Sequence, residues 1–248
     1  MRRDTRTLSR SAAIDNAAPA SGIGDLRHQI IASCARRSTR RATRRATRRS
    51  TSNDGGTHWY PLDAPARLLF EQVIQHLKTL VPNGREYVGA EWWFRATTTD
   101  TGFPFHFDRD EGVRREVISP DLASILYLGN AGGPTVIVDA TPSRRTAPSA
   151  AVAVHPRLGR FVMFPGTLLH GVLPGPPSRW PRVTMLVNWW RTVPRMEPAP
   201  EDRECTPASA SFVATGRTKP VALASFDPSR LLAKAAWREL IAKQATYR

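Results

Sequence analysis

The chain has 248 residues, 41% of them apolar, with seven Trp, enough to bury a sizeable core, and its formal net charge is +15. Residues 1–57 carry thirteen Arg, no Lys and four Asp, a charge of +9, so only +6 remains for the other residues. Two Cys, Cys34 and Cys205, exclude a disulfide framework, and no apolar run reaches the roughly 18 residues of a membrane span. We therefore expect an intracellular protein without membrane contact, with cytoplasm, nucleus and organelle left open.

Residues 1–57 are predicted to form a disordered Arg-rich tail. Between residues 36 and 51, a tetrad of two Arg, a Ser or Ala, and a Thr occurs four times in succession. This repeat has no apolar face to bury, and its like charges repel. A nucleic-acid-binding arm, a nuclear-localisation signal, a transit peptide and a contact for a basophilic kinase all fit it, as does a solvated extension without a partner.

Residues 58–192 have the composition of a folded domain. Apolar residues at helical spacing predict a helix over residues 63–80, with Asp63 as its cap and Pro82 as its stop. After Gly84 the pattern changes to short β-like runs separated by Gly and Pro, which predict an antiparallel sandwich or barrel. The predicted strands are residues 87–96, 105–108, 123–128, 135–139, 151–155, 161–164, 168–172 and 183–190.

Residues 193–248 are predicted to be a Pro-rich connector followed by a C-terminal helix over residues 223–246. Leu231, Leu232, Ala235, Leu240 and Ile241 would form the apolar side of that helix.

The chemistry of the sequence is concentrated at His106, Asp108 and His170. Alternate residues of a strand point to the same side, so His106 and Asp108 can bind one metal while Phe105 and Phe107 face away. The tripeptide alone is a weak signal, because His-x-Asp also arises by chance. Two imidazoles and one carboxylate, however, are the ligands that non-haem Fe(II) oxygenases use, and they leave positions on the iron open.

Arg182 begins the last predicted strand, twelve residues after His170, and Thr184 lies two positions further on. If that strand returns antiparallel beside the one that carries His170, Arg182 reaches the cavity near the metal. A fixed guanidinium is suited to hold a carboxylate through two hydrogen bonds, and Thr184 adds a hydroxyl on the same face. Trp92, Trp93, Trp189 and Trp190 are the aromatics available to exclude water there, although we expect at least half of them to be core residues.

Residues 86–191 resemble the Fe(II)- and 2-oxoglutarate-dependent dioxygenases of the prolyl-hydroxylase-like superfamily. The resemblance rests on the His106–Asp108 motif, the Gly132-Gly133-Pro turn, the segment 160–165, His170-Gly-Val, and Arg182 with the strand that follows it. It implies a mainly β fold, a double-stranded β-helix (jelly-roll) with flanking helices. It also implies that His106, Asp108 and His170 bind iron, that Arg182 holds 2-oxoglutarate, and that Thr184 and Tyr127 line the co-substrate site.

The activity implied is hydroxylation of a substrate that the sequence does not identify, with O2 consumed and 2-oxoglutarate converted to succinate and CO2. Two alternatives from other classes stay open. One is a non-catalytic jelly-roll that binds a ligand, and the other is a nucleic-acid-binding protein that acts through its Arg-rich tail.

Overall fold

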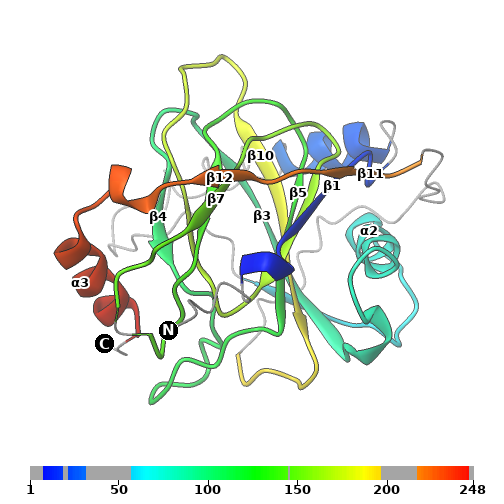
Figure 1. Cartoon of the computed structure of the whole chain (residues 1–248). Coiled ribbons are helices and arrows are strands. Elements are labelled where there is room, and N and C mark those ends of the chain that lie inside the picture. The colour runs from blue at the N-terminus through cyan, green and yellow to red at the C-terminus, as the bar shows by residue number, and fades with distance from the viewer. Residues whose placement is uncertain (1–7, 19–21, 32–56, 145, 197–216, 246–248) are drawn as a thin grey trace, which may run out of the picture.

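The computed structural model describes residues 8–18, 22–31, 57–144, 146–196 and 217–245 (Figure 1). Two antiparallel sheets face each other. The larger sheet has the strand order β11-β1-β8-β5-β10-β3-β2, and the smaller sheet has the order β12-β7-β6-β9-β4. The strands are β1 (Ala12–Asp15), β2 (His58–Pro61), β3 (Gly89–Thr97), β4 (Phe103–His106), β5 (Leu122–Tyr127), β6 (Thr135–Val138), β7 (Ala151–Val154), β8 (Phe161–Pro165), β9 (Leu169–Val172), β10 (Arg182–Trp190), β11 (Lys219–Val221) and β12 (Ala224–Phe226).

The pairing of the eight central strands defines the fold. β3 pairs with β10, β4 with β9, β5 with β8 and β6 with β7, all antiparallel, so each pair is nested inside the previous one along the chain. The first and third of these pairs belong to the larger sheet, and the second and fourth to the smaller sheet. A long hairpin wound across two sheets in this way is a double-stranded β-helix, so the predicted jelly-roll fold is confirmed.

All eight predicted strands are present, but one expectation about their arrangement is wrong. β10 does not return beside β9; it lies in the other sheet, between β5 and β3. The reason is the winding of the jelly-roll, in which the connection after β9 crosses from one sheet to the other. Arg182 therefore reaches the cavity from the sheet opposite His170.

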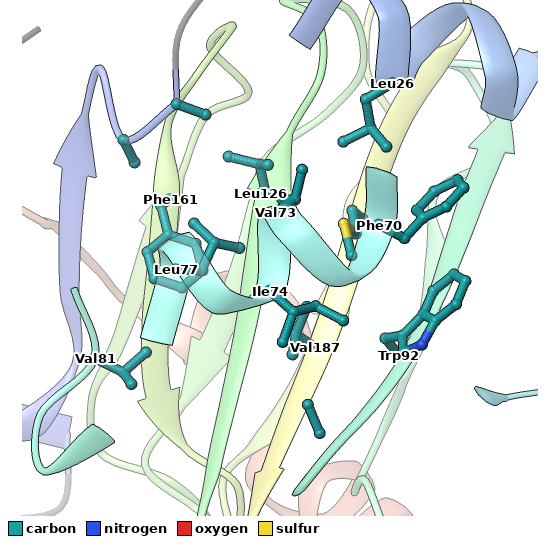
Figure 2. Packing of buried hydrophobic residues seen from close by; sticks show 14 of the residues in the cluster. Leu26, Phe70, Val73, Ile74, Leu77, Val81, Trp92, Leu126, Phe161 and Val187 are labelled. Carbon is teal, nitrogen blue, oxygen red and sulfur yellow. The ribbon is translucent and has the colours of Figure 1, made fainter. Parts of the chain in front are cut away.

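The outer face of the larger sheet is covered by helix α2 (Leu69–Lys78) and by a helix over residues 22–31. Figure 2 shows α2 lying across the sheet, with Phe70, Val73, Ile74 and Leu77 directed at the strands. Sheet residues such as Leu126 meet them there and are fully buried. This apolar layer holds the helices to the sheet and lies outside the jelly-roll.

A second apolar cluster fills the space between the sheets at one end. Ile125 and Phe164 come from the larger sheet, and Ile137 and Val154 come from the smaller one. Helix α3 (Lys234–Ala245) covers the outer face of the smaller sheet, where Trp237 and Ile241 are buried against residues such as Phe107. Ile125 belongs to the second cluster and also lines the cavity, so the packed part of the interior and the cavity are adjacent.

Part of the segment that was expected to be disordered is folded. Ala12–Asp15 forms β1, which pairs with both β8 and β11, and residues 22–31 form a helix with Ile23, Leu26 and Ile30 buried. The sequence prediction missed both β1, whose residues are alternately buried, and this helix with its apolar face. The many Arg in residues 1–57 favoured disorder for the whole segment. The Arg tetrads at residues 36–51 lie outside the described residues, so nucleic-acid or kinase contact stays a prediction.

Both predicted helices begin later than expected. α2 begins at Leu69 rather than at Asp63, because Pro65 disfavours helical backbone before it, and the Glu71 carboxylate accepts hydrogen bonds from the Arg67 and Leu68 amides. α3 begins at Lys234, because the chain before it forms β11, β12 and a 3-10 turn (Pro228–Arg230). Figure 1 shows this C-terminal segment crossing from one sheet to the other.

The short 3-10 turns Leu8–Arg10 and Gly84–Glu86 complete the secondary structure. In the described ranges, none of the helices combines the length and the apolar character needed to span a bilayer.

Candidate metal centre and adjoining cavity

His106, Asp108 and His170 meet at one point in space. His106 at the end of β4 and His170 on β9 are partners across the antiparallel pair, and their ring centroids lie 4.4 Å apart. The Asp108 Oδ1 lies 3.4 Å from the His106 Nε2 and 3.7 Å from the His170 Nε2. The three ligand atoms are within 4.8 Å of one another, close enough to share one metal ion. The predicted triad is thus assembled, although Asp108 lies two residues beyond the end of β4 and not inside the strand.

Backbone carbonyls fix both imidazoles in the same orientation. The Nδ1 of His106 lies 3.0 Å from the Pro104 carbonyl oxygen, and the Nδ1 of His170 lies 3.1 Å from the Leu168 carbonyl oxygen. A carbonyl oxygen only accepts hydrogen bonds, so Nδ1 carries the proton and Nε2 keeps its lone pair. Each Nε2 is the atom that faces Asp108, so both rings present a metal-binding nitrogen to the same place.

The charges at the triad suit a cation. Burial raises the pKa of the Asp108 carboxyl, but His170 and His106 outweigh it and hold the pKa at about 2. Burial lowers the pKa of His170 to about 4. The charge of Asp108 raises this pKa, and the charges of His106 and Arg95 lower it. Near neutral pH the site therefore holds an ionised carboxylate beside a neutral buried imidazole, which is the state in which these groups bind metals.

A bulge in β4 sets the direction of its side chains. Phe103 pairs with Val172 and His106 with His170, so the strand gains one residue relative to β9. Pro104, which has no amide hydrogen to donate, lies inside this bulge. As a result Phe103 and His106 both line the cavity, whereas Phe105 points outward and contacts Trp237 at 5.2 Å between ring centroids. Phe105 and Phe107 face away from the metal site, as the sequence predicted.

Arg182 lies in the same cavity as His106 and His170 and is 6% exposed. Its Nη2 donates to the Thr135 Oγ1 at 2.9 Å, and its Nη1 lies 3.5 Å from the Thr184 Oγ1. Its Nε is buried and has no hydrogen-bond partner among the described residues. Among the residues that the structure describes, no carboxylate forms an ion pair with this guanidinium. A buried cation in this state is suited to an anionic ligand from outside the chain.

Tyr127 and Gly132 both lie against the Arg182 side chain. The guanidinium lies 5.3 Å from the centre of the Tyr127 ring, and burial raises the pKa of the Tyr127 phenol, which keeps its hydroxyl protonated. That hydroxyl donates to the Thr135 Oγ1 at 2.7 Å. Gly132 has a φ of +105°, and a Cβ there would lie 2.6 Å from the Arg182 side chain, so glycine is needed for this close approach. The cavity itself is lined by Thr135 and Thr184 but not by Tyr127, which supports them from behind.

Sequence reasoning missed several residues of the site. Arg95 and Trp93 line the cavity from β3, and Arg95 lies over the Phe103 ring at 3.7 Å. They point inward because they alternate with Trp92 and Phe94, which pack toward α2. That alternation was visible in the sequence. The four Trp divide as expected, since Trp93 lines the cavity and Trp92, Trp189 and Trp190 are buried.

A buried carboxyl lies near the metal ligands without being one of them. The Oε2 of Glu91 accepts hydrogen bonds from the Asn188 Nδ2 at 3.4 Å and the Trp190 Nε1 at 3.3 Å. Burial raises the pKa of Glu91 to about 7, and the charge of Asp108 adds to the rise. Asn188 also donates to Asp108, so it connects the two carboxyl groups. Glu91 alternates with Trp93 and Arg95 along β3, so its inward direction follows from the same pattern, but its raised pKa does not.

No protein-family model and no curated protein matches this sequence. Solved structures with a similar chain path include a prolyl-4-hydroxylase from Pseudomonas putida, with 19% identity, a TM-score of 0.44, and 74% of this chain and 88% of that chain covered. AviO1 from Streptomyces viridochromogenes has 18% identity and a TM-score of 0.40, with 79% and 97% covered. EvdO2 from Micromonospora carbonacea, complexed with 2-oxoglutarate, has 15% identity and a TM-score of 0.42, with 81% and 96% covered. These TM-scores are low, so the fold assignment rests on the strand pairing.

Proposed function

We propose that this protein is an Fe(II)- and 2-oxoglutarate-dependent dioxygenase that hydroxylates a substrate and releases succinate and CO2. The observation that carries the proposal is the combination of two features in one cavity. One is the triad of His106, Asp108 and His170 with both Nε2 atoms directed at the carboxylate. The other is the buried guanidinium of Arg182, whose Nε has no hydrogen-bond partner in the part of the chain that the structure describes.

The donor set fits Fe(II). Two imidazole nitrogens and one carboxylate form the arrangement that leaves several iron positions open for other ligands. When bound, the iron supplies the activation of O2 that couples oxidative decarboxylation of 2-oxoglutarate to hydroxylation of a C–H bond. The protein's own part is to hold the three ligands, and the two carbonyl-bound Nδ1 atoms fix the orientation of both imidazoles.

Arg182 and its neighbours bind and orient the co-substrate. The guanidinium is always charged, and its planar donors match a carboxylate. Thr135 and Thr184 fix its direction, and the Tyr127 ring covers one face of it. Because Arg182, His106 and His170 line the same cavity, 2-oxoglutarate would have one carboxylate at Arg182 and its other end at the triad.

The first test is turnover of 2-oxoglutarate by the full-length protein. We expect succinate to form only with Fe(II), and the variants His106→Ala and Asp108→Ala to abolish it. Metal content measured on the same preparations links the loss to the triad. A folded wild-type protein that binds neither Fe(II) nor 2-oxoglutarate would sink the proposal. A protein that binds both but gives no succinate over a broad substrate panel would instead be a non-catalytic jelly-roll.

The second test separates the co-substrate end from the metal end. Replacing Arg182 with Met removes the charged hydrogen bonds and keeps much of the volume. We expect the Kd for 2-oxoglutarate to rise roughly tenfold to a hundredfold, while the affinity for Mn(II), used as a redox-stable substitute, stays within about twofold of the wild type. Equal losses of both affinities would show that Arg182 supports the fold and not the co-substrate.

A further inference from the structure

A second hollow lies on the surface of the protein, apart from the metal cavity. It has a volume of about 380 Å³, which is enough for a small molecule. Its lining comes from the helix over residues 22–31, from the loop between β5 and β6, and from the loops that precede β8 and β10. None of its lining residues lines the metal cavity, so the two are separate sites.

Arg27 brings a guanidinium group to this hollow. Its Nε is buried and has no hydrogen-bond partner among the described residues, and none of their carboxylates forms an ion pair with it. The guanidinium lies 5.6 Å from the centre of the Trp180 ring, and that of Arg179 lies 5.1 Å from the same centre. The described lining of the hollow includes neither Asp nor Glu. A partly buried positive charge in this state favours an anionic ligand.

The other polar side chains that line the hollow also offer hydrogen-bond donors. The Asn130 Oδ1 accepts a hydrogen bond from the Leu158 amide at 2.7 Å, so the Nδ2 hydrogens of Asn130 remain to be donated. The Ser178 Oγ accepts from the Trp180 amide at 3.1 Å, so the hydroxyl hydrogen of Ser178 remains to be donated as well. A guanidinium, an amide and a hydroxyl that all act as donors match the oxygens of a carboxylate or a phosphate.

Apolar surface adjoins these donors. Trp180 is 55% exposed and is the only aromatic residue among the exposed large apolar residues of the described ranges. Leu158, which is 41% exposed, lines the same hollow. An indole left in water forgoes the free energy of burying its apolar area, so an apolar group that covers Trp180 and Leu158 would be stabilised there.

We infer that this hollow binds a small molecule that carries a carboxylate or phosphate group on an apolar body. Arg27 binds the anionic group, with Asn130 and Ser178 as further donors, and Trp180 and Leu158 contact the apolar part. The inference does not depend on the proposed function, because none of these residues belongs to the metal cavity.

The test uses four probes, namely inorganic phosphate, phenyl phosphate, benzoate and the neutral benzamide. Each is titrated into the full-length protein at physiological ionic strength, which screens diffuse attraction to the positively charged chain. Ligand-observed NMR measures each Kd, through ³¹P for inorganic phosphate and ¹H for the aromatic probes. We expect at least one aromatic anion to bind roughly tenfold or more tightly than benzamide. The more tightly bound aromatic anion identifies carboxylate or phosphate as the preferred group.

Five variants locate the site. Arg27→Met should weaken binding of the aromatic anion roughly tenfold to a hundredfold, and Arg27→Lys should weaken it less. Trp180→Ala should weaken the aromatic anion several-fold and leave the Kd of inorganic phosphate unchanged. Arg238→Met is the matched control, because Arg238 is an exposed helical arginine outside the hollow. Neither Arg238→Met nor Arg182→Met, which changes the metal cavity, should affect binding of the anion.

Each other outcome overturns the inference. If neither aromatic anion binds better than benzamide, or if Arg27→Met leaves the Kd unchanged, the hollow is not an anion site. If Arg182→Met abolishes binding, the anion occupies the metal cavity. If phenyl phosphate and inorganic phosphate bind equally and Trp180→Ala changes neither, the apolar part of the inference is wrong. Urea denaturation checks the folding of each variant, and Arg27→Lys and Trp180→Ala decide the question if Arg27→Met does not fold.

Discussion

The two faces of the larger sheet differ in chemistry although the same strands supply both. On β10, Val183, Met185 and Val187 face α2 and are buried in an apolar cluster. Their neighbours Arg182, Thr184 and Leu186 line the cavity. The same alternation appears on β5, where Leu126 packs under α2 and Tyr127 supports Arg182.

This arrangement separates stability from chemistry at the level of single residues. The outer face gains free energy by burying apolar area against two helices. The inner face carries buried polar groups that cost free energy unless a ligand completes their interactions. A substitution on the outer face should therefore change the free energy of unfolding. A substitution at the next position, on the inner face, should change ligand affinity. The following predictions test that separation.

The largest effect is expected at the triad itself. His170→Ala removes one of the two imidazole ligands, and we expect the affinity for Mn(II) to fall by at least about a hundredfold, measured by titration calorimetry. Unfolding of the metal-free variant should change less than that of the Leu126→Ala variant described next. If the metal-free variant loses most of its free energy of unfolding, the main role of His170 is packing in the core and not metal binding.

The next effect belongs to the outer face. Leu126 is fully buried between α2 and the sheet, so Leu126→Ala should lower the free energy of unfolding by about 2–5 kcal/mol. Urea denaturation measures this loss. The affinity of the folded variant for Mn(II) should stay within about twofold of the wild type. A parallel loss of metal affinity would mean that the two faces are coupled through the strand.

The sequence was informative where a single strand or a local motif determines the structure. The eight strands were predicted from short β-like runs, and alternation correctly predicted that Phe105 faces away from His106. Arg182 and Thr184 were also predicted to line the cavity, and they do, although the strand pairing from which this was argued is wrong.

The features that the sequence did not predict depend on contacts between distant segments. β1 was not predicted because it lies in an Arg-rich region. It forms a strand by pairing with β8 and with β11, which lies near the other end of the chain. Glu91 has a raised pKa only because the fold brings Asp108 and Asn188 close to it. The alternation along β3 separates Arg95 from Trp92 and Phe94, but the side on which Arg95 lies becomes a cavity wall only when the two sheets face each other.

A smaller effect tests the inner face near the metal without removing a ligand. The pKa of Glu91 is raised to about 7 from an unfolded value near 4.5. Between these two values the folded protein binds more protons than the unfolded chain, so this carboxyl makes stability fall as the pH rises, by up to about 1.4 kcal/mol per pH unit. Above the folded pKa its destabilising effect is fully present.

Glu91→Gln removes this titration and should flatten the dependence of the metal-free protein's stability on pH across that window. Urea denaturation at several pH values measures the change. Glu111→Gln is the matched control, because it makes the same chemical change at a carboxyl that is 70% exposed. An unchanged slope in Glu91→Gln would show that the carboxyl is ionised in the folded state throughout the window.

The smallest effect separates adjacent residues on opposite faces. Tyr127→Phe removes the hydroxyl that donates to the Thr135 Oγ1 and should cost about 0.5–1.5 kcal/mol of stability, less than Leu126→Ala one position away. Because the same Oγ1 accepts from Arg182, the Kd for 2-oxoglutarate should also rise a few-fold. Tyr60→Phe is the control, since Tyr60 is a buried tyrosine outside the cavity whose hydroxyl donates to the Ala64 carbonyl at the same distance of 2.7 Å. It should lose similar stability with no change in 2-oxoglutarate affinity. Equal effects of the two variants on that affinity would mean that Tyr127 acts through the fold, and not through the Thr135 contact that orients Arg182.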